Sequence, residues 1–253
     1  MKSLLALSFV AALAAAGLQP ARAAEFSPAQ KDEIGAIVKD YLIQHPEALR
    51  EAMDAMDKHE KKLEADVREK IVDDQSGALF SSPHQAVVGN PKGDATLVEF
   101  FDYNCHFCKG ALPDIARLMQ SDPNLKVVLK DFPVLGPGSV EAAQVASAVR
   151  NQLTGDRFWQ FHQKLLGMHG PVGKEEALAV AKEMGVDMDR LNKDMVDPGI
   201  RTGFEEVMHM ADQLQINGTP SFVVGQEVVI GAVGYDQLKD KIDSVHKCGH
   251  AVC

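Results

Sequence analysis

The feature that most constrains the fold is a pair of cysteines, Cys105 and Cys108, which lies between a predicted strand and a predicted helix. The strand is the apolar run over 95–101, and the helix is the amphipathic stretch 109–119. A second predicted strand, 125–129, follows, and the order strand, helix, strand indicates an α/β unit. A cysteine at a helix N-terminus lies beside unpaired backbone N–H groups that stabilise the thiolate, the reactive form. The pattern therefore predicts a reversible dithiol.

In this dithiol, Cys105 is predicted to attack a substrate disulfide, and Cys108 to resolve the mixed disulfide that forms. His106 follows the nucleophile directly, and its imidazole is expected to stabilise the thiolate and to lower the pKa of Cys105. The alternative is half of a zinc site, with Cys248 and Cys253 supplying the other ligands. The strand before the pair and the helix after it are the context that the redox interpretation requires.

The rest of the chain divides into helical and mixed segments. Residues 27–74 have helical periodicity, interrupted at His45-Pro46, and the Gly- and Pro-rich stretch 75–94 is typical of a linker. Residues 139–214 show only helical periods. Two strands, 221–224 and 228–230, and a closing helix over 235–245 complete the pattern. We therefore expect a helical insertion within an α/β domain.

The second N-terminal helix carries a narrow apolar stripe at heptad spacing, formed by Leu49, Met53, Met56, Leu63 and Val67. One interpretation is that this helix folds its stripe onto its own domain. The other is self-association, which we favour because a seam of two residues in seven suits a partner helix better than a broad core.

The first 23 residues have the three parts of a secretory signal peptide. Lys2 precedes an uncharged apolar run over 4–18, and Ala21-Arg22-Ala23 has small residues where a signal peptidase cleaves. About 15 apolar residues fall short of the roughly 20 that a membrane anchor needs. We expect cleavage near Ala23 and a periplasmic mature protein, in a compartment where disulfides persist.

Composition excludes other classes of protein. The 26 Lys and Arg residues against 36 Asp and Glu residues give a net charge of −10, which argues against nucleic acid as a partner. Four cysteines are too few for a disulfide scaffold in 253 residues, so they are expected to mark sites.

Two motifs and the helical insertion make residues 84–246 resemble the DsbA family of bacterial periplasmic thiol-disulfide oxidoreductases. The motifs are Val98-Glu-Phe-Phe-Asp-Tyr-Asn-Cys-His-Phe-Cys108 and Gly218-Thr-Pro-Ser-Phe222. The resemblance implies an α/β thioredoxin fold with an inserted helical domain. It also implies that Cys105 is the exposed nucleophile and that Pro220 is a cis-proline facing the cysteines. No cofactor or metal is expected for this chemistry.

The resemblance assigns roles to two further residues. Thr219 would present its backbone to an extended substrate peptide beside the sulfurs. Glu99 lies in the strand before Cys105, where apolar neighbours would bury it, and the family carries a proton acceptor for the second cysteine at this position. The alternative for Glu99 is an outward-facing strand residue. Lys130, at the end of the next strand, is a candidate partner for Glu99.

Two departures from strict oxidases resemble the subgroup of suppressor-of-copper-sensitivity and Com1-like proteins: the N-terminal helices and Thr219 before the proline. This resemblance implies a homo-oligomer, assembled through the N-terminal helices, that acts as an oxidase, an isomerase or both. Expected partners are periplasmic proteins with thiols or disulfides and a membrane redox partner. The expected domains are a signal peptide (1–23), an oligomerisation region (24–80) and a catalytic domain (81–253).

The tail over 246–253 lies outside the resemblance and contains Cys248, Cys253, His246 and His250. The favoured interpretation is a small disulfide loop, because the compartment is oxidising. A soft-metal site of two thiolates and two imidazoles, suited to copper(I) or zinc, and a second redox-active pair stay open. The competing function for the whole chain is accordingly a non-enzymatic copper-binding protein.

Overall fold

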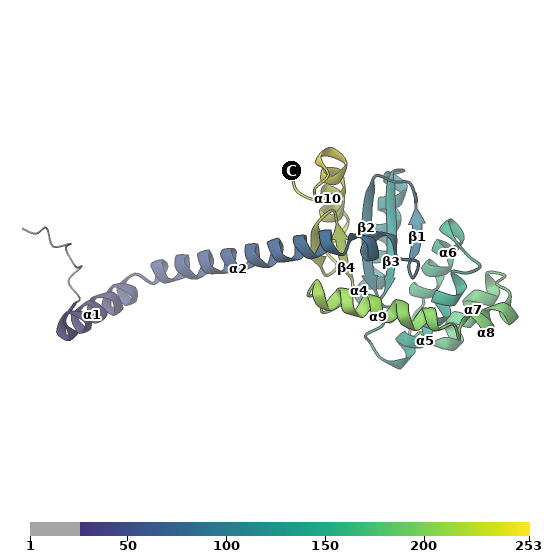
Figure 1. The fold of residues 1–253 in the computed structure, drawn as a ribbon, viewed down its shortest axis with the longest axis horizontal. Helices are drawn as coiled ribbons and strands as arrows, with labels where there is room; N and C mark the ends of the chain where they lie inside the picture. Colours follow the sequence, from purple (N-terminus) through teal and green to yellow (C-terminus); the bar gives the residue numbers. More distant parts are fainter. Residues whose placement is uncertain (1–25) are drawn as a thin grey trace, which may run out of the picture. The chain divides into compact units, whose positions relative to one another are not determined.

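The computed structural model describes residues 26–253, which divide into two units at Asp57 and Lys58 (Figure 1). The expected signal peptide, residues 1–23, lies outside the described residues. Within residues 26–253, none of the helices combines the length and the apolar character needed to cross a membrane.

The first unit contains α1 (Pro28–Gln44) and the beginning of α2 (Pro46–Asp74). Ser27 caps α1, because its Oγ accepts a hydrogen bond from the backbone N–H of Gln30 at 3.3 Å, while the Gln30 side chain accepts the N–H of Ser27 at 2.9 Å. The two helices are separated at His45, as expected for the residue before a proline. The large apolar side chains of this unit are exposed, including Ile37, Tyr41, Ile43, Leu49, Met53 and Met56.

The second unit is built on a five-stranded sheet in the order β1-β3-β2-β4-β5. The strands are β1 (Ala86–Gly89), β2 (Ala95–Phe101), β3 (Leu125–Asp131), β4 (Ser221–Val224) and β5 (Glu227–Ile230). Strands β2 and β3 are parallel, and the other neighbours are antiparallel. The helix α4 (His106–Ser121) connects the two parallel strands.

Helices cover both faces of the sheet, so that β2 and β3 are almost entirely buried. On one face, Leu97, Phe101 and Leu129 pack with α4 and with α10 (Tyr235–Cys248). On the other face, Val98, Phe100 and Val128 pack with residues of α9, α3 and the end of α2. Successive side chains of a strand point to opposite faces of the sheet. Each residue of β2 and β3 therefore belongs to one of these two faces, which determines which side chains meet at the site.

The predicted helical insertion is confirmed. It consists of α5 (Pro137–Val149), α6 (Gly155–Leu166), α7 (Lys174–Glu183), α8 (Met188–Asp194) and α9 (Pro198–Gln213). Helix α6 contacts the edge strand β1, as Figure 1 shows. The sheet and the insertion together form the thioredoxin arrangement that the resemblance implies.

The prediction of a linker over 75–94 is wrong in two places. Helix α3 (Ser76–Ser81) buries Leu79 completely, and β1 pairs with β3 in antiparallel register. Frequent Gly and Pro residues conceal these elements in the sequence, because each is only four to six residues long. Val72 and Leu79 belong to the core of the second unit, so the region expected as 24–80 contributes side chains to the catalytic domain.

Candidate active site

Strand β2 and helix α4 place the two cysteines. Strand β2 ends at Phe101, a short turn follows, and Cys105 is the N-cap residue of α4, with Cys108 in its first turn. Both are free thiols. Cys105 is 4% exposed and Cys108 is 0% exposed, so the expected nucleophile is nearly buried and is the only one of the pair with accessible surface.

The pKa of Cys105 is lowered to about 6, and hydrogen bonds are the cause. The largest contribution is a hydrogen bond with the Cys108 side chain. The Thr219 side chain and the backbone N–H groups of Cys108 and Phe107 add to it, the Cys108 N–H lying 3.3 Å from the Cys105 sulfur. These groups favour the thiolate, so Cys105 is ionised at neutral pH.

Cys108 has the opposite character. The hydrogen bond with Cys105 raises its pKa most, followed by burial and by the nearby charge of Glu99. At neutral pH the first sulfur is therefore a thiolate and the second a protonated thiol. The attacking role of Cys105 and the resolving role of Cys108 stay predictions.

The loop before β4 faces the pair. The Thr219–Pro220 peptide bond is cis, as the resemblance implies for Pro220. The carbonyl oxygen of Thr219 lies 3.1 Å from the Cys105 sulfur, so the loop contacts the nucleophile directly. Pro220 is buried and Thr219 is half-buried.

Glu99 is fully buried, and within the described residues neither of its carboxylate oxygens has a hydrogen-bond partner. Burial raises its pKa to about 8, with the charge of Cys105 as a smaller cause. Glu99 lies on the same face of β2 as Leu97 and Phe101, which face α4, because side chains two residues apart in a strand point to the same side. The outward-facing alternative is therefore wrong, and the side chain lies on the face of the sheet that carries the cysteines.

The suggestion that Lys130 pairs with Glu99 is also wrong. Glu99 is in register with Leu129, so Lys130 points to the opposite face. There its Nζ donates a hydrogen bond to the carbonyl of Ala78 at 2.6 Å and lies 3.8 Å from a Glu206 carboxylate oxygen. A pattern of residues alone does not give strand register, which is why the sequence suggests this pair.

His106 is exposed at the start of α4, and its ring lies 5.7 Å from that of Phe107. Its imidazole is not among the groups that lower the pKa of Cys105. The lowering of the Cys105 pKa that we expect from His106 comes from Cys108, Thr219 and backbone N–H groups.

Sequence reasoning missed Asp102, a buried carboxylate three residues before Cys105. It accepts hydrogen bonds from the backbone N–H groups of Asn104, Val134 and Leu135 and from the hydroxyl of Ser139, at 2.7–3.0 Å. Asx residues commonly bond backbone N–H groups two positions on, and that is the only signal the sequence offers.

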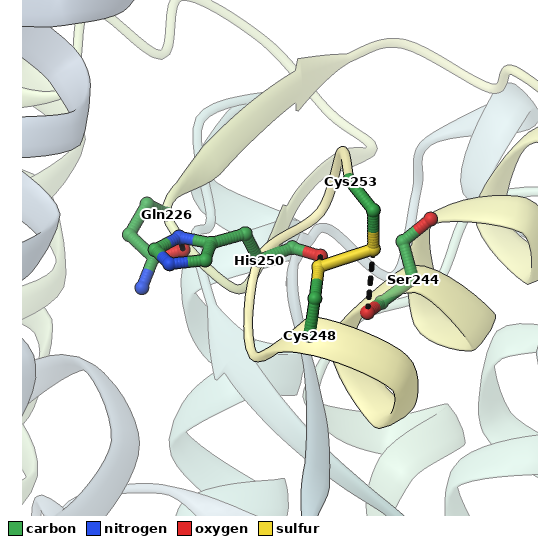
Figure 2. Close-up of a disulfide and its surroundings, with 5 residues drawn as sticks. All are labelled: Gln226, Ser244, Cys248, His250 and Cys253. Atoms are coloured by element: carbon green, nitrogen blue, oxygen red, sulfur yellow. Dashed lines mark hydrogen bonds between the residues drawn. A yellow bond between two sulfur atoms is a disulfide. The ribbon is translucent and has the colours of Figure 1, made fainter.

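The tail cysteines Cys248 and Cys253 form a disulfide, the interpretation that the sequence favours (Figure 2). The Cys253 sulfur lies 3.3 Å from the Ser244 carbonyl oxygen, and His250 Nδ1 lies 3.2 Å from Gln226 Oε1. In a disulfide neither sulfur is a thiolate, so this tail does not offer the ligands of a soft-metal site. Among the described residues, no three His, Cys, Asp or Glu side chains are placed to hold a metal ion.

Two family profiles match the chain: the DSBA-like thioredoxin domain over residues 96–243 and the Copper resistance protein ScsC N-terminal domain over residues 30–65. A thioredoxin-like oxidoreductase from Silicibacter pomeroyi DSS-3 is 41% identical, with a TM-score of 0.64 over 68% of this chain and 98% of that one. Proteus mirabilis ScsC in a transitional conformation is 26% identical, with a TM-score of 0.63 over 87% of this chain and 98% of that one.

Among curated proteins, Disulfide bond formation protein D of Bacillus subtilis strain 168 is 26% identical over 63% of this chain and 76% of its own length. The chain spans only 24% and 21% of the length of the first curated relatives it matches, which are Na(+)/H(+) antiporters.

The buried Glu99 makes stability depend on pH. With its pKa raised from 4.5 to about 8, the folded protein keeps a proton that the unfolded chain has already released. The stability that this group contributes is fully present below about pH 4.5 and is lost as pH rises through about 8. Glu99→Gln cannot ionise, so its stability relative to the wild type should increase by about 1.4 kcal/mol per pH unit across this range.

Urea unfolding of the reduced wild type and of Glu99→Gln at several pH values measures this difference. Taking the difference between the two proteins removes the contributions of titrating groups that do not interact with Glu99. A difference that stays constant from about pH 5 to pH 8 would show that Glu99 is not held as a neutral acid.

Proposed function

We propose that this chain, which belongs to the DsbA-like thioredoxin domain family, is a periplasmic protein thiol-disulfide oxidoreductase that acts through Cys105-His-Phe-Cys108. The proposal rests on the position and the ionisation of Cys105. This residue is the N-cap of α4, and the pKa of its thiol is lowered to about 6. Its sulfur lies 3.1 Å from the carbonyl oxygen of Thr219, beside the cis-proline. A reactive thiolate next to a backbone segment at a strand start suits attack on a disulfide within a polypeptide.

The reaction of the reduced form begins at Cys105. Its thiolate attacks one sulfur of a substrate disulfide, forms a mixed disulfide and releases the other substrate sulfur as a thiolate. Cys108 then loses its proton and attacks the Cys105 sulfur, which releases the reduced substrate and forms the Cys105–Cys108 disulfide. Alternatively, another substrate thiolate attacks the mixed disulfide, which returns Cys105 as a thiolate and leaves the substrate with a rearranged disulfide.

Glu99 is the proposed proton acceptor and donor for Cys108. Its charge contributes to the raised pKa of Cys108, which places the carboxyl group within electrostatic range of that sulfur. A group with a pKa of about 8 exchanges a proton readily near neutral pH. When Cys108 acts as the nucleophile, the ionised form of Glu99 takes the thiol proton. When Cys108 is the leaving group, Glu99 returns it.

In the oxidising direction, a substrate thiolate attacks the Cys105–Cys108 disulfide at Cys105, and Cys108 leaves and is protonated. A second substrate thiolate then displaces Cys105, whose low pKa makes it a good leaving group. The substrate gains a disulfide, and the protein gains two electrons and, because Cys105 leaves as a thiolate, one proton, which Cys108 holds. A membrane redox partner that accepts these electrons would regenerate the oxidised form.

Isomerase activity is proposed together with self-association. The large apolar side chains over residues 34–67 of α1 and α2 are about half exposed, among them Leu49, Met53 and Met56, and residues 30–65 match the ScsC N-terminal domain. A second copy of this chain would cover these side chains. An oligomer would hold several Cys105 thiolates around one substrate and so raise their effective concentration for repeated attack.

Substitution of the two active-site cysteines separates their roles. Cys105→Ala is expected to reduce disulfide exchange with a protein substrate to the uncatalysed rate, because Cys108 lacks thiolate character. Cys108→Ala is expected to accumulate mixed disulfides between Cys105 and substrate, detectable by mass spectrometry under non-reducing conditions. A Cys248→Ala/Cys253→Ala variant is the control and should keep exchange activity. Full activity of Cys105→Ala would overturn the proposed function.

Substitution on the apolar stripe tests assembly. Met53→Lys/Met56→Lys places two charges on the exposed apolar side of α2 and is expected to convert an oligomer into a monomer in sedimentation measurements. Reactivation of a scrambled-disulfide protein should then fall by about tenfold or more. Glu51→Lys changes the net charge by the same amount on the other side of the helix and should preserve both properties. A monomeric wild type would refute the assembly.

A further inference from the structure

The loop between α6 and α7, residues 167–173, is bound by residues on both sides of the Cys-His-Phe-Cys motif. Asn104 immediately precedes Cys105, and Lys109 immediately follows Cys108. Both side chains make hydrogen bonds to backbone atoms of this one loop. The loop belongs to the helical insertion, so two contacts join the insertion to the segment that carries the nucleophile.

Asn104 uses all of its polar atoms in this contact. Its Oδ1 accepts the N–H of Val172 at 2.7 Å, and its Nδ2 donates to the Val172 carbonyl at 2.8 Å and to Ser139 Oγ at 3.0 Å. The side chain therefore pairs with both backbone groups of one residue, as a neighbouring strand would. This pairing fixes the orientation of Asn104 relative to α5 and to the loop.

Lys109 makes the second contact. Its Nζ donates hydrogen bonds to the carbonyl oxygens of Met168, at 2.7 Å, and Gly170, at 3.3 Å. Lys109 lies in the first turn of α4, the same turn whose N–H groups hold the Cys105 sulfur. A displacement of the loop would therefore act on the start of this helix.

Asp102 holds the turn from its other side. One of its oxygens accepts the N–H of Asn104 and the hydroxyl of Ser139, each at 2.7 Å, and its carbonyl accepts the N–H of Cys105 at 3.0 Å. Three positions of the turn, Asp102, Asn104 and Cys105, are thus held in place by defined partners. Asn104 is held to the α6–α7 loop through Val172, so this side of the turn depends on the insertion.

We propose that Asn104 and Lys109 are positioning residues for Cys105: by binding the α6–α7 loop on both sides of the cysteine motif, they couple the helical insertion to the orientation of the nucleophilic sulfur. This inference rests on the proposed function. The Cys105 sulfur keeps its hydrogen bonds only while it lies at the α4 N-terminus and beside Thr219. A turn released from Val172 lets the sulfur move away from the N–H of Cys108 and from the carbonyl oxygen of Thr219.

The test is the pH dependence of alkylation of Cys105 in the reduced full-length chain, followed by mass spectrometry of the peptide that contains it. Asn104→Ala is expected to raise the midpoint by about one pH unit, which below the midpoint is a tenfold loss of thiolate. Lys109→Met is expected to shift the midpoint in the same direction. The matched control is Asn90→Ala, because Asn90 also links backbone groups, those of Lys92 and Pro123, but at the opposite end of β2 and β3.

An unchanged midpoint in Asn104→Ala, with thermal destabilisation similar to that of Asn90→Ala, would assign Asn104 a merely structural role and overturn the proposal. If Asn104→Ala does not fold, Lys109→Met decides, since its substitution removes two contacts at the end of a long side chain and one charge, and that charge is not among the causes that lower the pKa of Cys105. A wild-type midpoint in that variant overturns the proposal. Disulfide exchange by the wild type is measured separately: its absence would refute the proposed function but would leave the alkylation result able to decide positioning.

Discussion

The site depends on the position of one sulfur at one helix end. Cys105 caps α4, and its sulfur accepts the N–H of Cys108 while Thr219 contacts it from the loop before β4. Strand β2 ends shortly before the cysteine and so places it here. The burial of β2 and β3 between two layers of helices keeps this strand end in a fixed position. The thiolate is therefore stabilised where three elements meet: a strand end, a helix N-terminus and an adjacent loop.

The surroundings of the two sulfurs shift the pKa values of the two thiols in opposite directions. Hydrogen bonds lower the pKa of Cys105, whereas its hydrogen bond with Cys105, burial and Glu99 raise that of Cys108. Glu99 has no hydrogen-bond partner among the described residues, and burial holds it as a neutral acid up to about pH 8. A carboxyl group kept in this state is costly for the fold, and its raised pKa suits the proton transfer that we propose for it.

Local patterns predicted much of this arrangement. The apolar run over 95–101 and the amphipathic helix after Cys108 are local signals, and the structure forms both. Strand β1 and helix α3 were missed because each is short and gains its stability from contacts with distant strands. The suggested pairing of Lys130 with Glu99 is wrong because the alignment of β2 and β3, which local sequence does not give, places Glu99 in register with Leu129. The contacts of Asn104 depend on the packing of Val172, 68 residues away, and local sequence does not encode them.

The most direct test of the account is the ionisation of Cys105 in the reduced full-length protein. Ultraviolet absorbance of the thiolate, measured against pH in the wild type, reports this one sulfur around neutral pH, because the raised pKa of Cys108 keeps the second thiol protonated there. The account predicts a midpoint near pH 6, set by the Cys108 and Thr219 hydrogen bonds. A midpoint near 9, the ordinary value for a cysteine, would contradict it.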